Sequence, residues 1–170
     1  MLEIRPLRPD DSLAELTALL HKAYARLGAL GLNYTAVDQD EATTARRVAG
    51  GHCLVARVQG ALAGTVLLQP TYAQNDCAYF TRPGVAALHQ FAVDPARQGQ
   101  GVGRALMAAG EDWARTNGFR ELALDTAEPA THLVALYRSL GYEPVSHVQW
   151  PGKVYRSVVL SKRLDGGAAA

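Results

Sequence analysis

Seven residues in the middle of the chain place three glycines on alternate positions: Gln98, Gly99, Gln100, Gly101, Val102, Gly103 and Arg104. An apolar run precedes them and a helical pattern follows. Because glycine has no Cβ, the backbone N–H groups of this loop can converge on one point and let a bulky ligand approach. A helix that starts there adds unpaired N–H donors and about half a positive charge. The spacing predicts an anion site, which a diphosphate suits best.

Two common diphosphate motifs do not fit this spacing. A dinucleotide-binding G-x-G-x-x-G motif that starts at Gly99 would need a glycine where Arg104 stands. A Walker A loop needs Gly-Lys-Ser/Thr after four intervening residues, and the chain lacks it here. The remaining pattern, Gln98-x-x-Gly101-x-Gly103, resembles the (Arg/Gln)-x-x-Gly-x-(Gly/Ala) signature of the GNAT N-acetyltransferase superfamily. The resemblance implies that the loop grips the pyrophosphate of acetyl-coenzyme A.

The run before the loop, Phe91-Ala92-Val93-Asp94-Pro95, resembles the strand that precedes the loop in that family. In the family, the two parallel strands that flank the crossover helix splay apart, and pantetheine lies in the gap. The resemblance implies that Phe91, Ala92 and Val93 belong to the cofactor site, where strand backbone pairs with the pantetheine amides as in strand addition. The alternative is a glycine-rich turn without a ligand.

A tyrosine in a later helix is the candidate proton donor. Residues 135–142, Ala-Leu-Tyr-Arg-Ser-Leu-Gly-Tyr, resemble the second signature of the family, in which a helix tyrosine faces the sulfur of coenzyme A. The resemblance assigns the role of general acid to Tyr137. A phenol is protonated at pH 7 and can give its proton to a thiolate, whose ordinary pKa is lower. The alternative is that Tyr137 only packs in the core. Many family members carry an asparagine at the position of Ala130.

Acetyl transfer to an amine also needs a neutral amine, and His89, Gln90 and Asp125 are the candidates for the group that removes its proton. A primary amine is neutral in only about one molecule in a thousand at pH 7. His89 has a suitable pKa, and strand alternation places it on the same face as Phe91 and Val93. The alternatives are a half-buried structural histidine at 89 and a capping or solvated carboxylate at 125.

Three segments are expected to contact the acceptor: residues 30–35, residues 72–80 and the turn around Trp150. The candidate substrate residues are Leu32, Tyr34, Tyr72 and Asp125. These segments carry aromatic residues and few acids, whereas a polycationic acceptor would want several carboxylates. We therefore expect a small amine, an amino acid or a peptide N-terminus. Exposed aromatic residues are equally compatible with a homodimer interface.

Periodicity and turn chemistry predict the elements that position these residues. Strands are expected at 2–7, 52–58, 61–69, 86–93, 121–126, 142–149 and 153–164. Helices are expected from the N-cap residues Asp10-Asp11-Ser12 to Gly28, from a capping box of Asp38 and Glu41 to Gly50-Gly51, from about 101 to 117, and from Pro129 to Gly141. This order resembles the GNAT fold, an α/β (α+β) arrangement with a mixed, twisted seven-stranded sheet flanked by about four helices. It predicts one domain over 1–164 and a flexible tail at 165–170.

Composition excludes several classes of protein. The 170 residues fit one domain, and 17 basic against 16 acidic residues give a formal charge of +1, so no global field favours nucleic acid or anionic lipid. With no secretory signal and no long apolar run, we expect a cytoplasmic protein without membrane contact. Cys53 and Cys77 form no framework, and the five histidines have no paired ligand spacing, so no metal is expected.

These observations lead to an acetyl-CoA-dependent N-acetyltransferase that acts by direct attack of a primary amine. The alternative is a non-catalytic acyl-CoA sensor of the same fold. Transfer to a hydroxyl, or of a longer acyl group, stays open because the loop contacts only the diphosphate.

Overall fold

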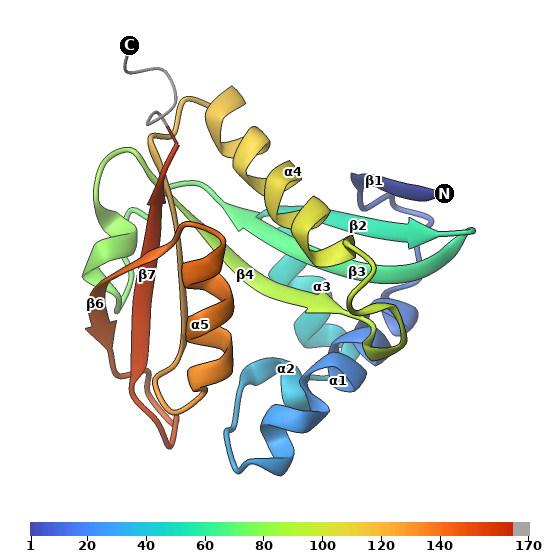
Figure 1. Ribbon diagram of the computed structural model, residues 1–170, viewed down its shortest axis with the longest axis horizontal. Coiled ribbons are helices and arrows are strands. Elements are labelled where there is room, and N and C mark those ends of the chain that lie inside the picture. The colour runs from blue at the N-terminus through green and yellow to red at the C-terminus, as the bar shows by residue number, and fades with distance from the viewer. Residues whose placement is uncertain (165–170) are drawn as a thin grey trace. The chain divides into compact units, whose positions relative to one another are not determined.

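The computed structural model describes residues 1–164, and the expected tail at 165–170 lies outside them. The described residues form a mixed seven-stranded sheet with the strand order β1-β2-β3-β4-β5-β7-β6 (Figure 1). The strands are β1 (Leu2–Pro6), β2 (His52–Val58), β3 (Ala61–Gln69), β4 (Val85–Val93), β5 (Glu121–Ala127), β6 (Glu143–Val148) and β7 (Ser157–Arg163). The α-helices are α1 (Leu13–Ala29), α2 (Thr35–Asp38), α3 (Glu41–Ala49), α4 (Val102–Thr116) and α5 (Thr131–Ser139). The predicted α/β class and seven strands are confirmed, with five α-helices instead of about four.

The chain forms two compact units. Unit 1 comprises Met1–Leu68 and Gln90–Gly110, and unit 2 comprises Gln69–His89 and the described residues from Glu111 on. β4 and α4 each contribute residues to both units.

Unit 1 is built on an antiparallel meander of β1, β2 and β3. Gln59 and Gly60 join β2 to β3, and both have positive φ angles, 53° and 81°. Two consecutive residues with positive φ are typical of the type I′ turn, whose twist matches that of the flanking strands. The strands expected at 52–58 and 61–69 therefore form a tight hairpin.

Helices cover the two faces of this meander. Leu16 and Leu19 of α1 pack with Cys53, Val55 and Leu67 of β2 and β3. On the opposite face, Gly64 lets the first turns of α4 approach, since a Cβ there would lie 2.8 Å from Leu106 Cδ1 (Figure 1). The alternation of side chains along β3 thus buries both faces.

Two predicted helix boundaries in unit 1 are wrong. Of the three expected N-cap residues, Asp10 to Ser12, it is Ser12 that caps α1, by accepting a hydrogen bond from the Glu15 amide at 3.1 Å. Gly28, however, does not end the helix; its missing Cβ leaves room for Val37, whose Cγ1 would be 2.8 Å away. The cap of α3 is Asp40, which accepts from the Thr43 amide, because Asp38 is the last residue of the short helix α2.

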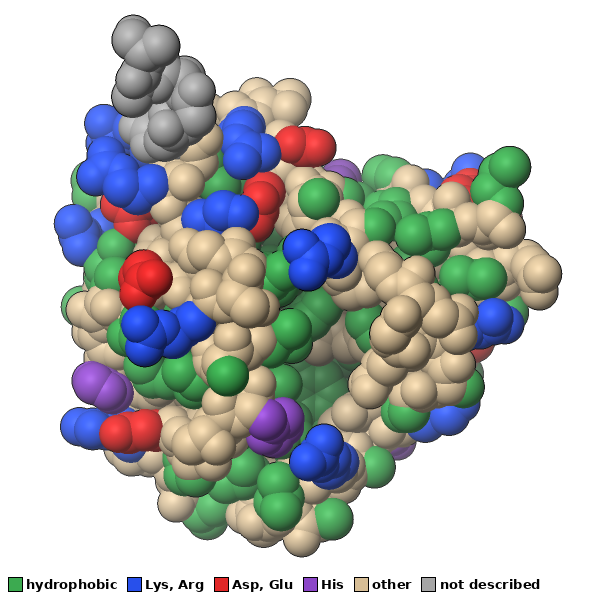
Figure 2. All heavy atoms as spheres, viewed as in Figure 1, with side chains coloured by type: hydrophobic (Ala, Val, Ile, Leu, Met, Phe, Trp, Pro, Cys, Tyr) green, Lys and Arg blue, Asp and Glu red, His purple; other side chains and the backbone are tan. Residues whose placement is uncertain are grey.

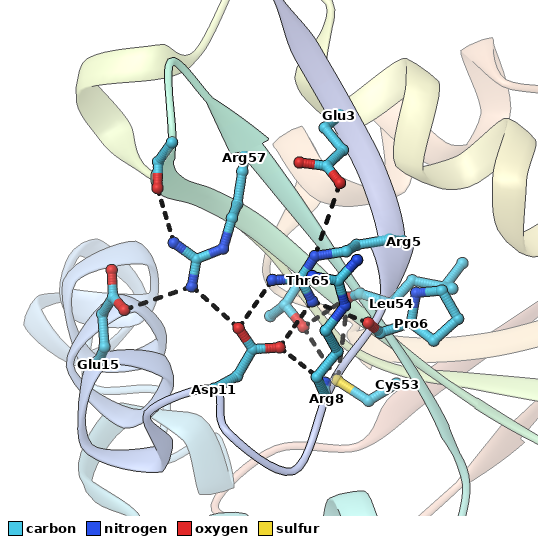
Figure 3. Close-up of polar contacts among 11 residues, drawn as sticks. Glu3, Arg5, Pro6, Arg8, Asp11, Glu15, Cys53, Leu54, Arg57 and Thr65 are labelled. Carbon is cyan, nitrogen blue, oxygen red and sulfur yellow. Dashed lines mark hydrogen bonds and ion pairs between the residues drawn. The ribbon is translucent and has the colours of Figure 1, made fainter.

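A cluster of charges ties the start of unit 1 together (Figure 3). Asp11 accepts two hydrogen bonds from the Arg5 guanidinium at 2.7 and 2.8 Å and one from Arg57 at 3.2 Å. The Arg8 amide also donates to Asp11, at 2.7 Å. The hydrogen bonds from Arg5, above all, hold the pKa of Asp11 well below its usual range. These bonds fix β1 and β2 to the segment that enters α1.

Unit 2 contains the parallel contact and the last antiparallel strands. Val85–Ala87 of β4 pairs with Glu121–Ala123 of β5, which confirms the predicted crossover. β5 pairs with β7, and β7 with β6, both antiparallel. One face of these strands packs against the segment before β4 through a hydrophobic cluster that includes Phe80, Ala87, Ala123, Val148 and Val159.

Buried polar contacts hold the second half of α4 in unit 2. Glu111 is 7% exposed, accepts from the Tyr142 hydroxyl at 3.1 Å, and pairs with Lys162 at 3.0 Å. Burial and the nearby Glu111 carboxylate raise the pKa of Tyr142. On α5, Tyr137 is 7% exposed, whereas the neighbouring Leu136 is 41% exposed.

The charge distribution on the surface and the character of the helices can be compared with the expectations from composition. On the face shown in Figure 2, basic and acidic side chains are interspersed, in keeping with the small formal charge. Within residues 1–164, no helix is both long and apolar enough to cross a membrane.

Candidate functional site

The glycine loop in unit 1 joins β4 to α4. Asp94 ends the strand, and its carboxylate accepts from the Ala96 amide at 2.9 Å and from Lys22 Nζ at 3.0 Å. The amide of Ala96 first, and Lys22 second, hold the pKa of Asp94 below its usual range. A 3-10 turn, Pro95–Arg97, follows, and Gly99 and Gly101 then take positive φ angles of 76° and 84°. The chain thereby bends sharply into α4.

The amides of this loop are the feature that fits an anion. Among residues 1–164, the N–H groups of residues 98 to 104 make no hydrogen bond of good geometry to a backbone or side-chain acceptor. The first intrahelical bond links the Ala105 amide to the Gly101 carbonyl at 3.0 Å. Gln98 to Gly101 are exposed, and a Cβ on Gly99 or Gly101 would meet nothing within 4 Å. A run of unpaired donors at a helix start, with open space before it, can hold a diphosphate.

Gly103 has a packing role in addition to the predicted contact with the cofactor. A Cβ at this position would lie 3.2 Å from Phe91 Cζ and 3.3 Å from Val93 Cγ2. Gly103 therefore lets α4 pack closely on β4.

The three strand residues predicted to contact the cofactor lie at the end of β4 in unit 1. Ala92 packs with Leu20 and Ala36, on the face covered by α1 and α2. Phe91 and Val93 lie on the opposite face, beside Gly103, as strand alternation predicts for residues 91 to 93. The carbonyl of Phe91 accepts a hydrogen bond from the Tyr24 hydroxyl at 3.0 Å. The sequence did not predict this contact of Tyr24. The position of Tyr24 in the helix indicates a partly buried side chain but not its hydrogen-bond partner.

A buried polar network surrounds Gln90, one of the three candidates for the group that deprotonates the amine. Gln90 is 6% exposed, and its Oε1 accepts from Gln39 Nε2 at 2.9 Å. Gln39 Nε2 also donates to Thr44, and Gln39 Oε1 accepts from Arg47. Gln90 has a φ angle of 51°, in the left-handed region that non-glycine residues rarely adopt. Its side chain thus serves structure, and no observation supports it as a base.

His89 and Tyr72 lie together in unit 2. The Tyr72 hydroxyl is 2.9 Å from His89 Nε2. The His89 ring stands edge-on to Phe80, with ring centroids 5.6 Å apart, and Phe80 is fully buried. The backbone amide of Tyr72 donates to the carbonyl of Phe80, which fixes the segment that carries Tyr72.

Asp125 belongs to the same aromatic cluster. Its Oδ2 accepts a hydrogen bond from Trp150 Nε1 at 2.8 Å, and the Trp150 ring stacks on Phe80 at a centroid distance of 6.4 Å. Phe80 therefore links His89 to the Trp150–Asp125 pair. The sequence placed these residues in separate candidate segments, and only the structure joins them.

The remaining candidates have mixed surroundings. Tyr137 on α5 is 7% exposed, with its ring edge-on to Tyr142 at 6.3 Å. Tyr34 is half-buried and packs edge-on against Tyr24. Leu32 is 8% exposed, so its side chain mainly packs in unit 1. A cavity of about 410 Å³ in unit 2 lies among α5, β6 and β7, and no predicted site residue lines it.

Comparison with known proteins gives a family match over most of the chain. The model described as Acetyltransferase (GNAT) family matches residues 15–142. Over 64 residues the chain is 42% identical to aminoglycoside N(6')-acetyltransferase type 1 of Stenotrophomonas maltophilia, a match that covers 38% of this chain and 42% of that protein. The match thus spans less than half of that relative's length.

Two further comparisons cover nearly whole chains. The chain is 27% identical over 150 residues to an uncharacterized N-acetyltransferase of Schizosaccharomyces pombe, covering 85% of this chain and 86% of that one. A GNAT family acetyltransferase from Elizabethkingia anophelis, solved with acetyl-CoA bound, superposes with a TM-score of 0.68 at 15% identity, over 95% and 97% of the two chains. This structural likeness shows a shared fold.

Proposed function

Because the chain belongs to the acetyltransferase (GNAT) family, we propose that it transfers the acetyl group of acetyl-CoA to a primary amine by direct attack. The acceptor would be a small amine, an amino acid or a peptide N-terminus. Both relatives named above are N-acetyltransferases, and the structural neighbour binds acetyl-CoA. The observation that carries the proposal is the row of unpaired amides between Gln98 and Arg104.

In this proposal the glycine loop holds the pyrophosphate of acetyl-CoA. The exposed amides at the start of α4 donate to its oxygens, and the partial positive charge of the helix start adds to the attraction. Phe91, Ala92 and Val93 would border the pantetheine arm. When bound, the cofactor supplies an activated acetyl group as a thioester.

Proton transfers at both ends of the reaction are assigned to unit 2. Tyr137 would donate its phenolic proton to the leaving thiolate, since a phenol is protonated at neutral pH and a thiol is the stronger acid. His89 would take the proton that the acceptor ammonium must lose before it can attack. Tyr72 and Asp125, together with Tyr34 and Leu32, would contact the acceptor.

The test separates cofactor binding from chemistry. Tyr137→Phe should lower thiol release from acetyl-CoA with a panel of amines by about 100-fold or more, while coenzyme A still binds. Gly101→Val should abolish coenzyme A binding, because it forces a β-branched residue into the φ of 84° and puts its side chain into the ligand space.

Gly60→Val is the matched control for the loop variant. Gly60 also has a positive φ with nothing within 4 Å of a Cβ, but lies in the β2–β3 turn. Unchanged coenzyme A affinity in a folded Gly101→Val protein would contradict the loop assignment. Binding without thiol release across the panel would instead favour an acyl-CoA sensor.

A further inference from the structure

The histidine that is proposed to deprotonate the amine is within hydrogen-bonding distance of a phenol. His89 Nε2 lies 2.9 Å from the Tyr72 hydroxyl. A phenol that donates to this nitrogen keeps lone pairs on its oxygen, and these can accept another proton. The group that meets the acceptor amine can therefore be the Tyr72 oxygen, with His89 behind it.

The surrounding rings hold this pair in place. Tyr72 and His89 stand edge-on to each other with centroids 6.0 Å apart, and Phe80 flanks both rings, at 6.2 and 5.6 Å. Phe80 is fully buried and anchored through its amide to the Cys77 carbonyl. Both Tyr72 and His89 stay partly exposed, so the pair can exchange protons with bound molecules and with water.

A carboxylate belongs to the same aromatic cluster. Asp125 is held by Trp150 Nε1 at 2.8 Å, and Trp150 stacks on Phe80. The other titratable groups at this cluster are Cys77, which is buried, and Tyr79, which bonds to Glu121.

We propose that Tyr72 is a catalytic residue that receives the proton of the acceptor ammonium and relays it to His89. The R–NH3⁺ group gives one proton to Tyr72 Oη while the phenolic proton moves to His89 Nε2. The products are a neutral amine, a phenol and an imidazolium, and the imidazolium then releases its proton to water. No electron is transferred. This inference rests on the proposed acetyl transfer to an amine.

The first test uses ¹⁵N NMR of the ligand-free protein to determine which nitrogen of His89 carries the proton. In ¹⁵N-labelled wild type, the neutral His89 ring should carry its proton on Nδ1, with Nε2 unprotonated and hydrogen-bonded. Tyr72→Phe should shift the Nε2 resonance, whereas Tyr79→Phe, which removes a hydroxyl at the edge of the same cluster, should not. A proton on Nε2 of the neutral ring would overturn the relay.

The second test follows kcat/KM for an amine against pH. For the wild type, kcat/KM should level off above the pKa of the relay. For Tyr72→Phe and for His89→Gln, kcat/KM should be about 100-fold lower at pH 7 and should then rise with the fraction of neutral amine as the pH increases. The double variant should lose no more than either single one. The relay would be contradicted if the two variants lost kcat/KM additively, or if Tyr72→Phe left the pH profile of kcat/KM unchanged. Neither result would contradict the proposed acetyl transfer.

Coenzyme A binding and wild-type thiol release separate the two proposals. All these variants should bind coenzyme A as the wild type does. A wild type that releases no thiol with any amine would contradict the proposed function and the relay with it.

Discussion

At the scale of single residues, buried polar side chains hold conformations that the backbone alone would not favour. Gln90 keeps a left-handed φ inside a strand, and its hydrogen bond to Gln39 stabilises that geometry. Asp11 gathers three donors on one carboxylate, so that a charged group can stay largely buried. Partnered buried groups rigidify a structure, whereas unpartnered ones destabilise it.

Because Gln90 has a left-handed φ angle, we expect glycine at this position to be more stable than alanine, which reverses the usual order in a strand. Gln90→Gly and Gln90→Ala both lose the bond to Gln39, but only alanine also meets the backbone strain, so the glycine variant should be more stable by about 1 kcal/mol. At Ala92, where no positive φ occurs, Ala92→Gly should instead destabilise. Urea unfolding of the variants measures both effects. Alanine proving the more stable residue at position 90 would refute the argument.

The charge cluster around Asp11 predicts a pH-dependent stability. Asp11→Asn should lower the free energy of unfolding at pH 7 by on the order of 2 kcal/mol. Because the folded pKa lies below the unfolded value of about 3.9, the stabilisation is present above about pH 4 and is lost as the pH falls through the folded pKa. Urea unfolding at pH 7 and pH 3 should show a smaller difference at pH 3.

Asp10→Asn is the matched control, since Asp10 is exposed and next to Asp11. It should change the unfolding free energy little at either pH. An equal loss for Asp11→Asn at both pH values would show that the charge of Asp11 is not the cause.

At the scale of elements, close packing decides where the glycine loop can lie. The start of α4 touches β3 at Gly64 and β4 at Gly103, and both contacts need a residue without a side chain. The position of the helix axis is therefore set by van der Waals contact. The orientation of the loop amides before Val102 depends on the position of this helix. Close packing at Gly64 and Gly103 thereby positions the loop amides that are proposed to bind the ligand.

Gly103→Val should destabilise unit 1 by overpacking. Even a Cβ would press on Phe91 and Val93, and a branched side chain should lower the unfolding free energy by about 1–3 kcal/mol. Ala108→Val, at an exposed position on the same helix, should lose less, because it pays only the helix propensity of valine. Equal stability of the two variants in thermal unfolding would contradict this packing role.

At the scale of the whole molecule, the proposed site residues divide between the units. The glycine loop and the end of β4 belong to unit 1, while His89, Tyr72, Asp125 and Tyr137 belong to unit 2. The family match over residues 15–142 includes parts of both units. Diphosphate binding is therefore assigned to unit 1 and proton transfer to unit 2.

This division predicts which part of coenzyme A stabilises the protein. At a concentration 100 times its Kd, coenzyme A should raise the unfolding free energy by about 2.7 kcal/mol. Pantetheine, which lacks the diphosphate, should give little stabilisation at the same concentration, since the loop amides would have no partner. Differential scanning calorimetry compares the two ligands. Equal stabilisation by both would rule out the loop as the main binding element.

The sequence by itself determined what depends on neighbouring residues. The Gln59-Gly60 turn, the Ser12 cap, the strand–loop–helix around Gly101 and the parallel crossover all follow from periodicity, turn chemistry and capping, which act over a few residues. The same rules misplaced the cap of α3, because Asp38 and Asp40 both offer a suitable carboxylate and the short helix α2 has no periodic signature.

Only the tertiary structure decided which distant side chains meet. Tyr72 and His89 are 17 positions apart, and Asp125 and Trp150 are 25 apart, yet each pair is in hydrogen-bonding distance. The packing roles of Gly28 and Gly103 likewise depend on Val37 and Phe91, which periodicity does not connect to them. Such contacts arise when strands and helices pack, and their partners are chosen by shape and burial of the assembled elements.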